Sequence, residues 1–288
     1  MDLRALGYHE GFMRRYAALV IVSMSFCGCK PPEGDHVRAI VGAVLIDGLG
    51  GPPMSDSVVV VAGDRIREAG PRANVLIPDN ADKIDGSGKY LVPSPLDVYP
   101  SAEAARSSHA LQIFKIDREE LESAHDAGTR VIGHVSTQAD VRALVDGGAV
   151  GFVGMITDTE DLDPALVSRL RNLRIFFAPA LVSQGPNLEV AHRNTRRLFI
   201  AGVPIALASN GGDAAREPEL LADAGIPALD VIVAITENTA GALAELDQTG
   251  TIQAGKRADL LLLSANPGED IRNLRKVAQR MSAGEWVK

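Results

Sequence analysis

The most informative stretch of the sequence is Gly250-Thr-Ile-Gln-Ala-Gly-Lys-Arg-Ala-Asp-Leu-Leu-Leu-Leu263. Its four consecutive leucines predict a strand buried on both faces, because a half-exposed strand alternates apolar and polar residues. Gly250 and Gly255 precede this strand and predict tight turns, since glycine adopts positive φ without a steric penalty. We therefore expect the chain to end in β structure that packs into the protein core.

The periodicity of the sequence changes twice upstream of this stretch. Residues 38–92 contain short β-type runs separated by turns, such as Ser57-Val-Val-Val-Val-Ala62. From residue 93 to 249, short apolar strands alternate with helical patterns, and residues 250–288 return to β patterns. Strands that alternate with helices predict parallel β-α units. The order predicts a β/α barrel flanked by a discontinuous β domain that both ends of the chain form.

The composition is that of an ordinary folded protein. The chain has 288 residues, of which 46% are hydrophobic and 23% are charged, so disorder is not expected. The formal net charge of -8 argues against nucleic acid as a partner, because phosphate binding requires clustered Lys and Arg. The sequence also has no glycine-rich phosphate-binding loop. The predicted partner is therefore an unidentified small molecule or protein.

The N-terminus has the pattern of an export signal. Arg14 and Arg15 precede a short apolar run over residues 17–26, which Cys27-Gly28-Cys29 follows. A membrane-spanning helix needs about 20 apolar residues, so a signal peptide explains this run better. The small residue before Cys29 resembles a bacterial lipoprotein cleavage box, in which Cys29 would carry the lipid.

We predict a signal peptide over residues 1–29 and a polar tether over residues 30–37. The predicted location is the periplasm or the outer membrane of a bacterial cell, with membrane contact only through a lipid anchor on Cys29. Two alternatives stay open. Translation could start at Met13, and the apolar run could instead be a buried N-terminal helix.

Three segments resemble motifs of the metal-dependent amidohydrolase superfamily. Residues 250–263 resemble its C-terminal signature, and Ile235-Thr-Glu-Asn-Thr-Ala240 resembles the helix before that signature. Ile84-Asp-Gly-Ser-Gly-Lys-Tyr-Leu-Val-Pro93 resembles the segment that leads to the first barrel strand. The likeness is closest to the imidazolonepropionase and prolidase-like branch, of which the chain would be a degenerate and truncated member.

The resemblance implies an α/β fold with a TIM-type (β/α) barrel over residues 93–249. A small β-sandwich domain, made of residues 38–92 and 250–288, would flank it. The barrel is expected to be incomplete, because only residues 102–112 separate its first strand from the next predicted one. A βαβ crossover needs about a dozen residues for its connection alone. We expect about six barrel strands instead of eight, and the exposed strand edges would favour a homo-oligomer.

The chemistry of the superfamily depends on a divalent metal that lowers the pKa of a bound water. The resemblance places Asp97 at the family's first acidic position, but Tyr99 and Ser101 stand at the next two positions, which should be histidine ligands. Neither residue type is a good zinc ligand. The resemblance also matches Lys115 to a metal-bridging lysine and His134 to a histidine ligand on a later strand.

Two further positions lack the residue that the resemblance implies. Gly154 stands where a histidine ligand is expected, and Asn210 stands where the family has its catalytic aspartate. An amide cannot accept a proton from water, so Asn210 would not act as a general base. Only Lys115 and His134 remain as suitable ligand types, whereas catalytic zinc usually has three protein ligands and a water.

Each remaining candidate also has an ordinary structural explanation. His134 could be a hydrogen-bonded polar group at a strand end, and Lys115 could pair with Asp97. Asp213 could be a displaced acid, although its spacing from Asn210 points it into the loop.

These replacements predict an amidohydrolase-like protein that is catalytically impaired or inactive and acts in the cell envelope as a binding protein. No cofactor is expected. If the chain is active, it would use zinc or another divalent metal. The alternative is a metal-dependent hydrolase of non-peptide or dipeptide C–N bonds that uses a rearranged single-metal site. A third possibility is a degenerate gene product with no selected activity.

Overall fold

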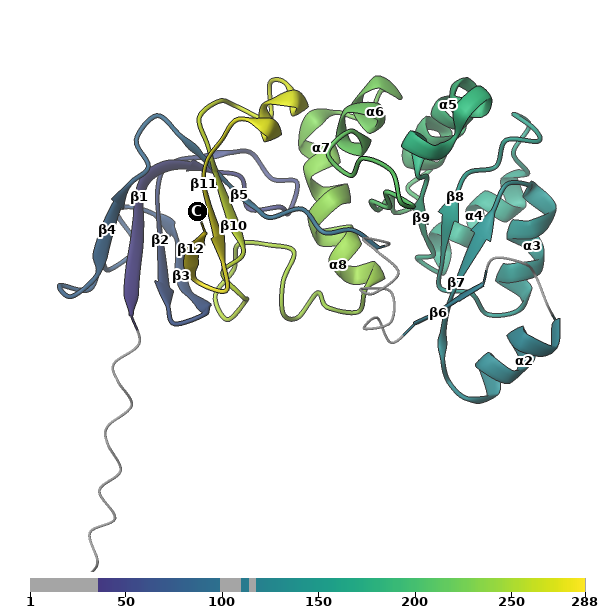
Figure 1. Cartoon of the computed structure of the whole chain (residues 1–288), viewed down its shortest axis with the longest axis horizontal. Helices are drawn as coiled ribbons and strands as arrows, with labels where there is room; N and C mark the ends of the chain where they lie inside the picture. The colour runs from purple at the N-terminus through teal and green to yellow at the C-terminus, as the bar shows by residue number, and fades with distance from the viewer. Residues whose placement is uncertain (1–35, 99–109, 114–117, 288) are drawn as a thin grey trace, which may run out of the picture. The chain divides into compact units, whose positions relative to one another are not determined.

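A computed structural model describes residues 36–98, 110–113 and 118–287 (Figure 1). The predicted signal peptide and three of the predicted site residues, Tyr99, Ser101 and Lys115, lie outside the described residues. The described residues belong to one compact unit, Asp35–Lys288. No helix within the described ranges is long and apolar enough to cross a membrane.

Both ends of the chain contribute strands to one eight-stranded sheet. The N-terminal part supplies β1 (Val37–Leu45), β2 (Met54–Ala62), β3 (Arg65–Pro71), β4 (Asp82–Asp85) and β5 (Tyr90–Pro93). The C-terminal part supplies β10 (Leu260–Leu263), β11 (Val277–Ser282) and β12 (Glu285–Val287). The strand order is β12-β11-β10-β5-β1-β2-β3, and β4 pairs with β1. Antiparallel pairing of β5 with β10 therefore joins the two parts of the chain.

The leucine strand β10 lies between two hydrophobic clusters. Leu261 and Leu263 pack into the cluster that contains the helices, and the other two leucines pack with residues of β1 and β2. All four leucines are buried, because alternate side chains of a strand point to opposite faces. The predictions of a doubly buried strand and of turns at Gly250 and Gly255, where φ is 89° and 87°, are confirmed.

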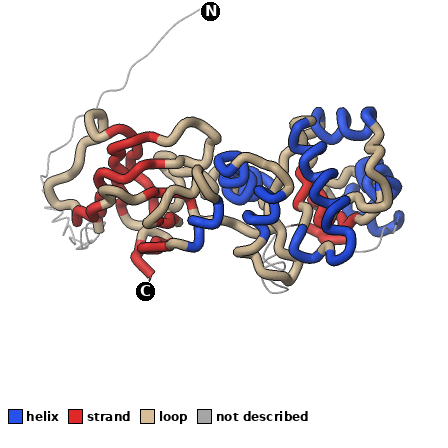
Figure 2. The backbone as a smooth tube through the Cα atoms, turned by 90° about the horizontal axis from the view of Figure 1, so that it is seen from above, coloured by secondary structure: helices blue, strands red, loops and turns tan. Residues whose placement is uncertain are grey.

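The middle of the chain forms a second, four-stranded parallel sheet, in the order β6 (Ala110–Ile113), β7 (Arg130–Val135), β8 (Gly151–Gly154) and β9 (Phe176–Ala178). Helices α2 (Arg118–Asp126), α3 (Gln138–Asp146) and α4 (Pro164–Asn172) connect successive strands, and α5 (Leu188–Ile200) follows β9. Helices lie beside this sheet in Figure 2. The predicted alternation of helices with parallel strands is confirmed.

Capping residues set the start of two of these helices. The Thr137 hydroxyl accepts a hydrogen bond from the Asp140 N–H, and the Asp140 carboxylate accepts one from the Thr137 N–H. This capping box satisfies backbone donors at the start of α3 that have no helical partner. Asp163 caps α4, and Pro164 fits its first turn, where the absent N–H is not needed.

Two further segments lie against the parallel sheet. Residues 205–208 extend it past β9, with a bridge between Phe177 and Ile205 and a 2.9 Å hydrogen bond from the Ala206 N–H to the Phe177 carbonyl. On the far side of this segment, the Val98 N–H donates to the Leu207 carbonyl at 2.9 Å. The described residues show no closed barrel. The structure therefore establishes a mixed α/β fold with an eight-stranded sheet and a parallel β/α region, whereas the shortened barrel stays a prediction.

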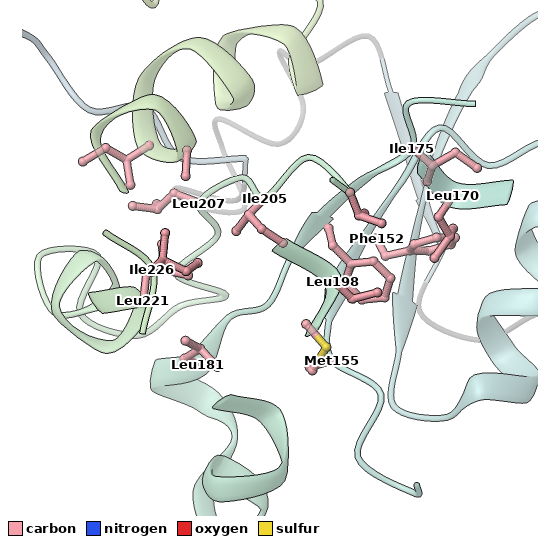
Figure 3. Packing of buried hydrophobic residues seen from close by; sticks show 14 of the residues in the cluster. Phe152, Met155, Leu170, Ile175, Leu181, Leu198, Ile205, Leu207, Leu221 and Ile226 are labelled. Atoms are coloured by element: carbon pink, nitrogen blue, oxygen red, sulfur yellow. The ribbon is translucent and has the colours of Figure 1, made fainter. Parts of the chain in front are cut away.

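The two faces of the parallel sheet carry different side chains. Larger residues such as Phe152 and Leu207 pack toward the helices (Figure 3). The rings of Phe152 and Phe177 lie 5.1 Å apart between centroids on this side. The opposite face carries Phe176 together with mostly smaller residues of successive strands, namely Val98, Ile132, Val153, Ala178, Ala206 and Ala208. The alternation of side chains along each strand separates these two packing layers.

The segment 235–240, which resembles a helix of the superfamily, lies in an interrupted helical region. Here α7 (Ala228–Val233) and α8 (Thr239–Ala242) are joined by a π-helical turn, Ala234–Asn238. The hydroxyl of Thr236 donates to the Ile232 carbonyl, and that of Thr239 donates to the Ala234 carbonyl. Threonine hydroxyls that bond to preceding carbonyls compete with the backbone ladder and widen the turn.

Candidate functional site

Several predicted site residues lie at the carboxyl ends of neighbouring strands. His134 pairs with Val153 in the ladder between β7 and β8, and Gly154 is the last residue of β8. Asn210 follows the segment 205–208, which extends the same sheet. The carboxyl ends of parallel strands meet at one edge, where active sites of β/α folds lie. The structure therefore places these positions along a single edge of the sheet.

Backbone hydrogen bonds hold Asp97 at this edge. Its Oδ1 accepts a hydrogen bond of 3.1 Å from the N–H of Ser209, a buried residue. The next residue, Val98, donates its own N–H to the Leu207 carbonyl. These two links fix Asp97 beside the strand end that Asn210 follows.

Glu217 is the acidic residue that the sequence analysis missed. It is the first residue of α6 (Glu217–Asp223), and its relative exposure is 0%. Its two carboxylate oxygens accept hydrogen bonds from the backbone N–H groups of Leu181 and Val182, at 2.7 and 2.9 Å. Burial raises the pKa of Glu217 to about 7, and the nearby negative charge of Asp97 acts in the same direction.

The backbone around Ala180 supplies the two donors that Glu217 binds. Ala180 is buried and has a φ of 48°, in the left-handed region that non-glycine residues rarely adopt. The turn begins a short 3-10 helix, Leu181–Ser183, whose first N–H groups have no partner within the helix. No local motif marked Glu217, because its partners lie 36 and 35 residues away in the sequence.

His134 is a half-buried histidine near the end of β7. Burial lowers its pKa to about 4, because the charged imidazolium loses its hydration. The ring is therefore neutral at physiological pH. A neutral imidazole suits both a hydrogen-bonding role and a metal-binding role, so its charge state alone does not choose between them.

Gly154 has a backbone conformation that excludes a side chain. Its φ is 99°, and a Cβ built on this residue would lie 2.4 Å from the carbonyl oxygen of Val135. Real Cβ atoms do not approach backbone oxygen so closely, and an L-residue at this φ is strained in any case. A histidine ligand at residue 154 would require the backbone of β7 or β8 to shift.

Asn210 and Asp213 lie in the loop between the 205–208 segment and α6. Asn210 has a φ of 47°, which its short polar side chain tolerates better than most. Asp213 is exposed, and its carboxylate accepts a hydrogen bond from the Ala215 N–H at 2.9 Å. The Asp213 side chain therefore bonds to the backbone of its own loop, in agreement with its predicted orientation into the loop.

The side chains that the structure describes do not fit the catalytic metal of the family. Within the described ranges there is no group of three or more His, Cys, Asp or Glu side chains that could hold a metal ion. Glu217 directs both of its oxygens at backbone N–H groups. Catalytic zinc usually has three protein ligands.

Comparison with known proteins identifies the fold. The chain matches no protein-family model and no curated protein sequence. It is similar to a putative prolidase from Bifidobacterium longum, at 21% identity and a TM-score of 0.72 over 88% of this chain and 95% of that chain. Phenylurea hydrolase B is 17% identical, with a TM-score of 0.73 over 88% and 97% of the two chains. The A. niger ochratoxinase is 14% identical, with a TM-score of 0.74 over 89% and 96%.

These solved structures are amidohydrolase-superfamily proteins, and the chain has the fold of that superfamily. The resemblance seen in residues 84–93, 235–240 and 250–263 is therefore confirmed at the level of the fold. At such low identity the comparison shows the scaffold alone, because one scaffold supports many activities.

Proposed function

We propose that this chain is a catalytically impaired amidohydrolase-fold protein that acts as a binding protein. The observation that carries the proposal is the backbone at Gly154, where the resemblance implies a histidine ligand. A Cβ there would lie 2.4 Å from the Val135 carbonyl oxygen, so the strand end is adapted to glycine. A histidine in place of Gly154 would therefore require a change in the backbone as well as in the side chain.

The other groups at this edge do not replace the missing base. The amide of Asn210 cannot take a proton from water. A histidine with a pKa of about 4, such as His134, is a weak base at neutral pH. Glu217 is fully buried and bound to two backbone N–H groups, which keeps it away from a reacting water.

The proposal includes a shortened TIM-type barrel flanked by a β-sandwich. The four-stranded parallel sheet and the segments 96–98 and 205–208 support a barrel of about six strands. It also includes export to the cell envelope as a lipoprotein modified at Cys29, and self-association through open strand edges. The pattern of residues 14–29 supports the export step.

A second candidate function is a metal-dependent hydrolase of non-peptide or dipeptide C–N bonds. The fold similarity to a prolidase and to phenylurea hydrolase B favours it. The single metal would have to be held by Lys115 and His134, with Asp97 or Asp213 as a third ligand. Lys115 lies outside the described residues.

Metal content separates the two functions. The full chain is purified without chelators, together with His134→Ala and the control His36→Ala, whose ring is well exposed. Inductively coupled plasma mass spectrometry then gives the metal per chain. The proposal expects zinc, manganese and iron far below one equivalent in all three proteins. Near-stoichiometric metal that is lost only in His134→Ala would overturn it in favour of the hydrolase.

A further inference from the structure

A cavity of about 580 Å³ opens at the amino ends of strands β7, β8 and β9. Its lining includes Arg130, the first residue of β7, Val150, which precedes β8, and Phe176, the first residue of β9. His134 and Gly154 lie at the other ends of these strands. Small-molecule pockets are typically about 300–1,000 Å³, so this volume suits a small ligand.

Arg130 is a half-buried cation at the wall of this cavity. Its guanidinium donates one hydrogen bond of 2.6 Å to the carbonyl of Ala242, the last residue of α8. Across the described ranges, no carboxylate forms an ion pair with Arg130. Burial lowers the pKa of this guanidinium, as expected for a cation that has lost water without gaining an opposite charge. The remaining N–H groups of the guanidinium are donors that an anion could occupy.

A second arginine stands at the exposed rim of the cavity. Arg174 lies just before β9 with a φ of 53°, and within the described part of the chain its side chain makes neither a hydrogen bond nor an ion pair. The lining also contains one acid, Glu237. Burial lowers the pKa of Lys256, and the negative charge of Glu237 opposes this lowering. The lining itself carries the two positive charges of Arg130 and Arg174 against the single negative charge of Glu237, so positive charge is in excess.

The rest of the wall is mainly apolar and includes Val150, Ile175, Phe176 and Leu246. We propose that this cavity binds a small organic carboxylate, with its charged group on Arg130 and Arg174 and its hydrocarbon body against this wall. Arginine donates two parallel hydrogen bonds to a carboxylate, a geometry that a neutral amide cannot match. The apolar wall disfavours inorganic phosphate, which needs polar partners on every side. This site does not depend on whether the opposite edge of the sheet binds a metal.

Isothermal titration of the full chain tests the site, with benzoate and hexanoate as probes and benzamide as the uncharged analogue of benzoate. At least one carboxylate should bind saturably, and benzoate should bind about tenfold or more tightly than benzamide. Arg130→Met and Arg174→Gln should each weaken carboxylate binding about tenfold or more. The control Arg169→Gln alters an exposed arginine that pairs with Asp146 and should leave binding unchanged.

Arg174 is exposed, so Arg174→Gln keeps the test valid if loss of the Ala242 contact unfolds Arg130→Met. Circular dichroism checks the folding of each variant. The inference is overturned if neither carboxylate binds saturably, or if benzamide binds as well as benzoate. It is also overturned if inorganic phosphate binds more tightly than both carboxylates, or if Arg174→Gln binds like the unaltered protein.

Discussion

The buried carboxyl of Glu217 should make the protein less stable as the pH rises from 5 to 8. Its pKa is raised from the ordinary value of 4.5 to about 7, chiefly by burial and also by the charge of Asp97. The folded protein therefore holds a proton that the unfolded chain has already released between these two values. Below pH 4.5 both states are protonated and no penalty applies. Above pH 7 the folded state carries a buried charge.

The size of this effect follows from the two pKa values. A carboxyl with a pKa of about 7 in the folded state and about 4.5 in the unfolded state lowers the free energy of unfolding by about 3 kcal/mol between these limits. Glu217 is fully buried, so solvent does not screen this penalty appreciably. Glu217→Gln removes the charge while it keeps the shape of the side chain. The Gln NH2 group cannot accept a hydrogen bond, so the variant loses one of the two backbone bonds at every pH. Relative to the unaltered protein, it should nevertheless gain about 2–3 kcal/mol of stability from pH 5 to pH 8.

Urea unfolding at several pH values, followed by circular dichroism, measures this difference. His134 and His192, whose pKa values burial lowers, titrate in both proteins and cancel in the comparison. The control Glu269→Gln changes an exposed carboxylate that makes no ion pair with the described residues, so it should leave the pH dependence as it is. The reasoning is refuted if Glu217→Gln is less stable than the unaltered protein by a constant amount from pH 5 to pH 8. That result would mean that the Leu181 and Val182 N–H groups outweigh burial and keep the carboxylate charged.

Two further changes test the packing that surrounds the candidate site and joins the ends of the chain. Gly154→Ala should lower the free energy of unfolding by about 1–3 kcal/mol because of its positive φ, and by more because of the clash with Val135. Gly88→Ala, with φ of 71° and open space around it, should show only the loss due to φ. Equal losses in urea unfolding would show that the clash is absent. Arg38→Met should cost about 1–3 kcal/mol, because the buried Arg38 donates to the Gly284 carbonyl and to the Glu285 carboxylate. Glu285→Gln should lower the free energy of unfolding by less than about 1 kcal/mol, since that carboxylate is mostly exposed. A larger loss of stability in Glu285→Gln than in Arg38→Met would contradict this explanation.

Much of the fold could be predicted because its signals are local. The leucine run of β10 has an apolar residue at every position, as expected for a strand that lies between two hydrophobic clusters. The capping residues Thr137 and Asp163 lie directly before the helices that they cap, so these helix starts depend on neighbouring residues alone. The π-helical turn at Ala234–Asn238 was not predictable from apolar periodicity, because it depends on threonine hydroxyls that bond to preceding carbonyls.

The candidate site was less predictable, because its contacts join residues that are distant in the sequence. Asp97 accepts a hydrogen bond from Ser209 across 112 residues. In the cavity at the other ends of the strands, Arg130 donates to Ala242 across the same separation. Glu217 stands at a helix start, and the turn at Ala180, far away in the sequence, presents the backbone N–H groups that it binds. The exclusion of a side chain at Gly154 depends on the position of the Val135 carbonyl oxygen, which cannot be predicted from the sequence.

The absence of a working metal site is the central claim, and cobalt(II) titration of the full chain tests it most directly. Cobalt bound by several protein ligands develops a visible absorption band, because its electronic transitions depend on coordination geometry. The account predicts that added cobalt gives only the spectrum of the free ion, in the unaltered protein and in His134→Ala alike. A saturable band at one equivalent, present in the unaltered protein and absent in His134→Ala, would contradict it.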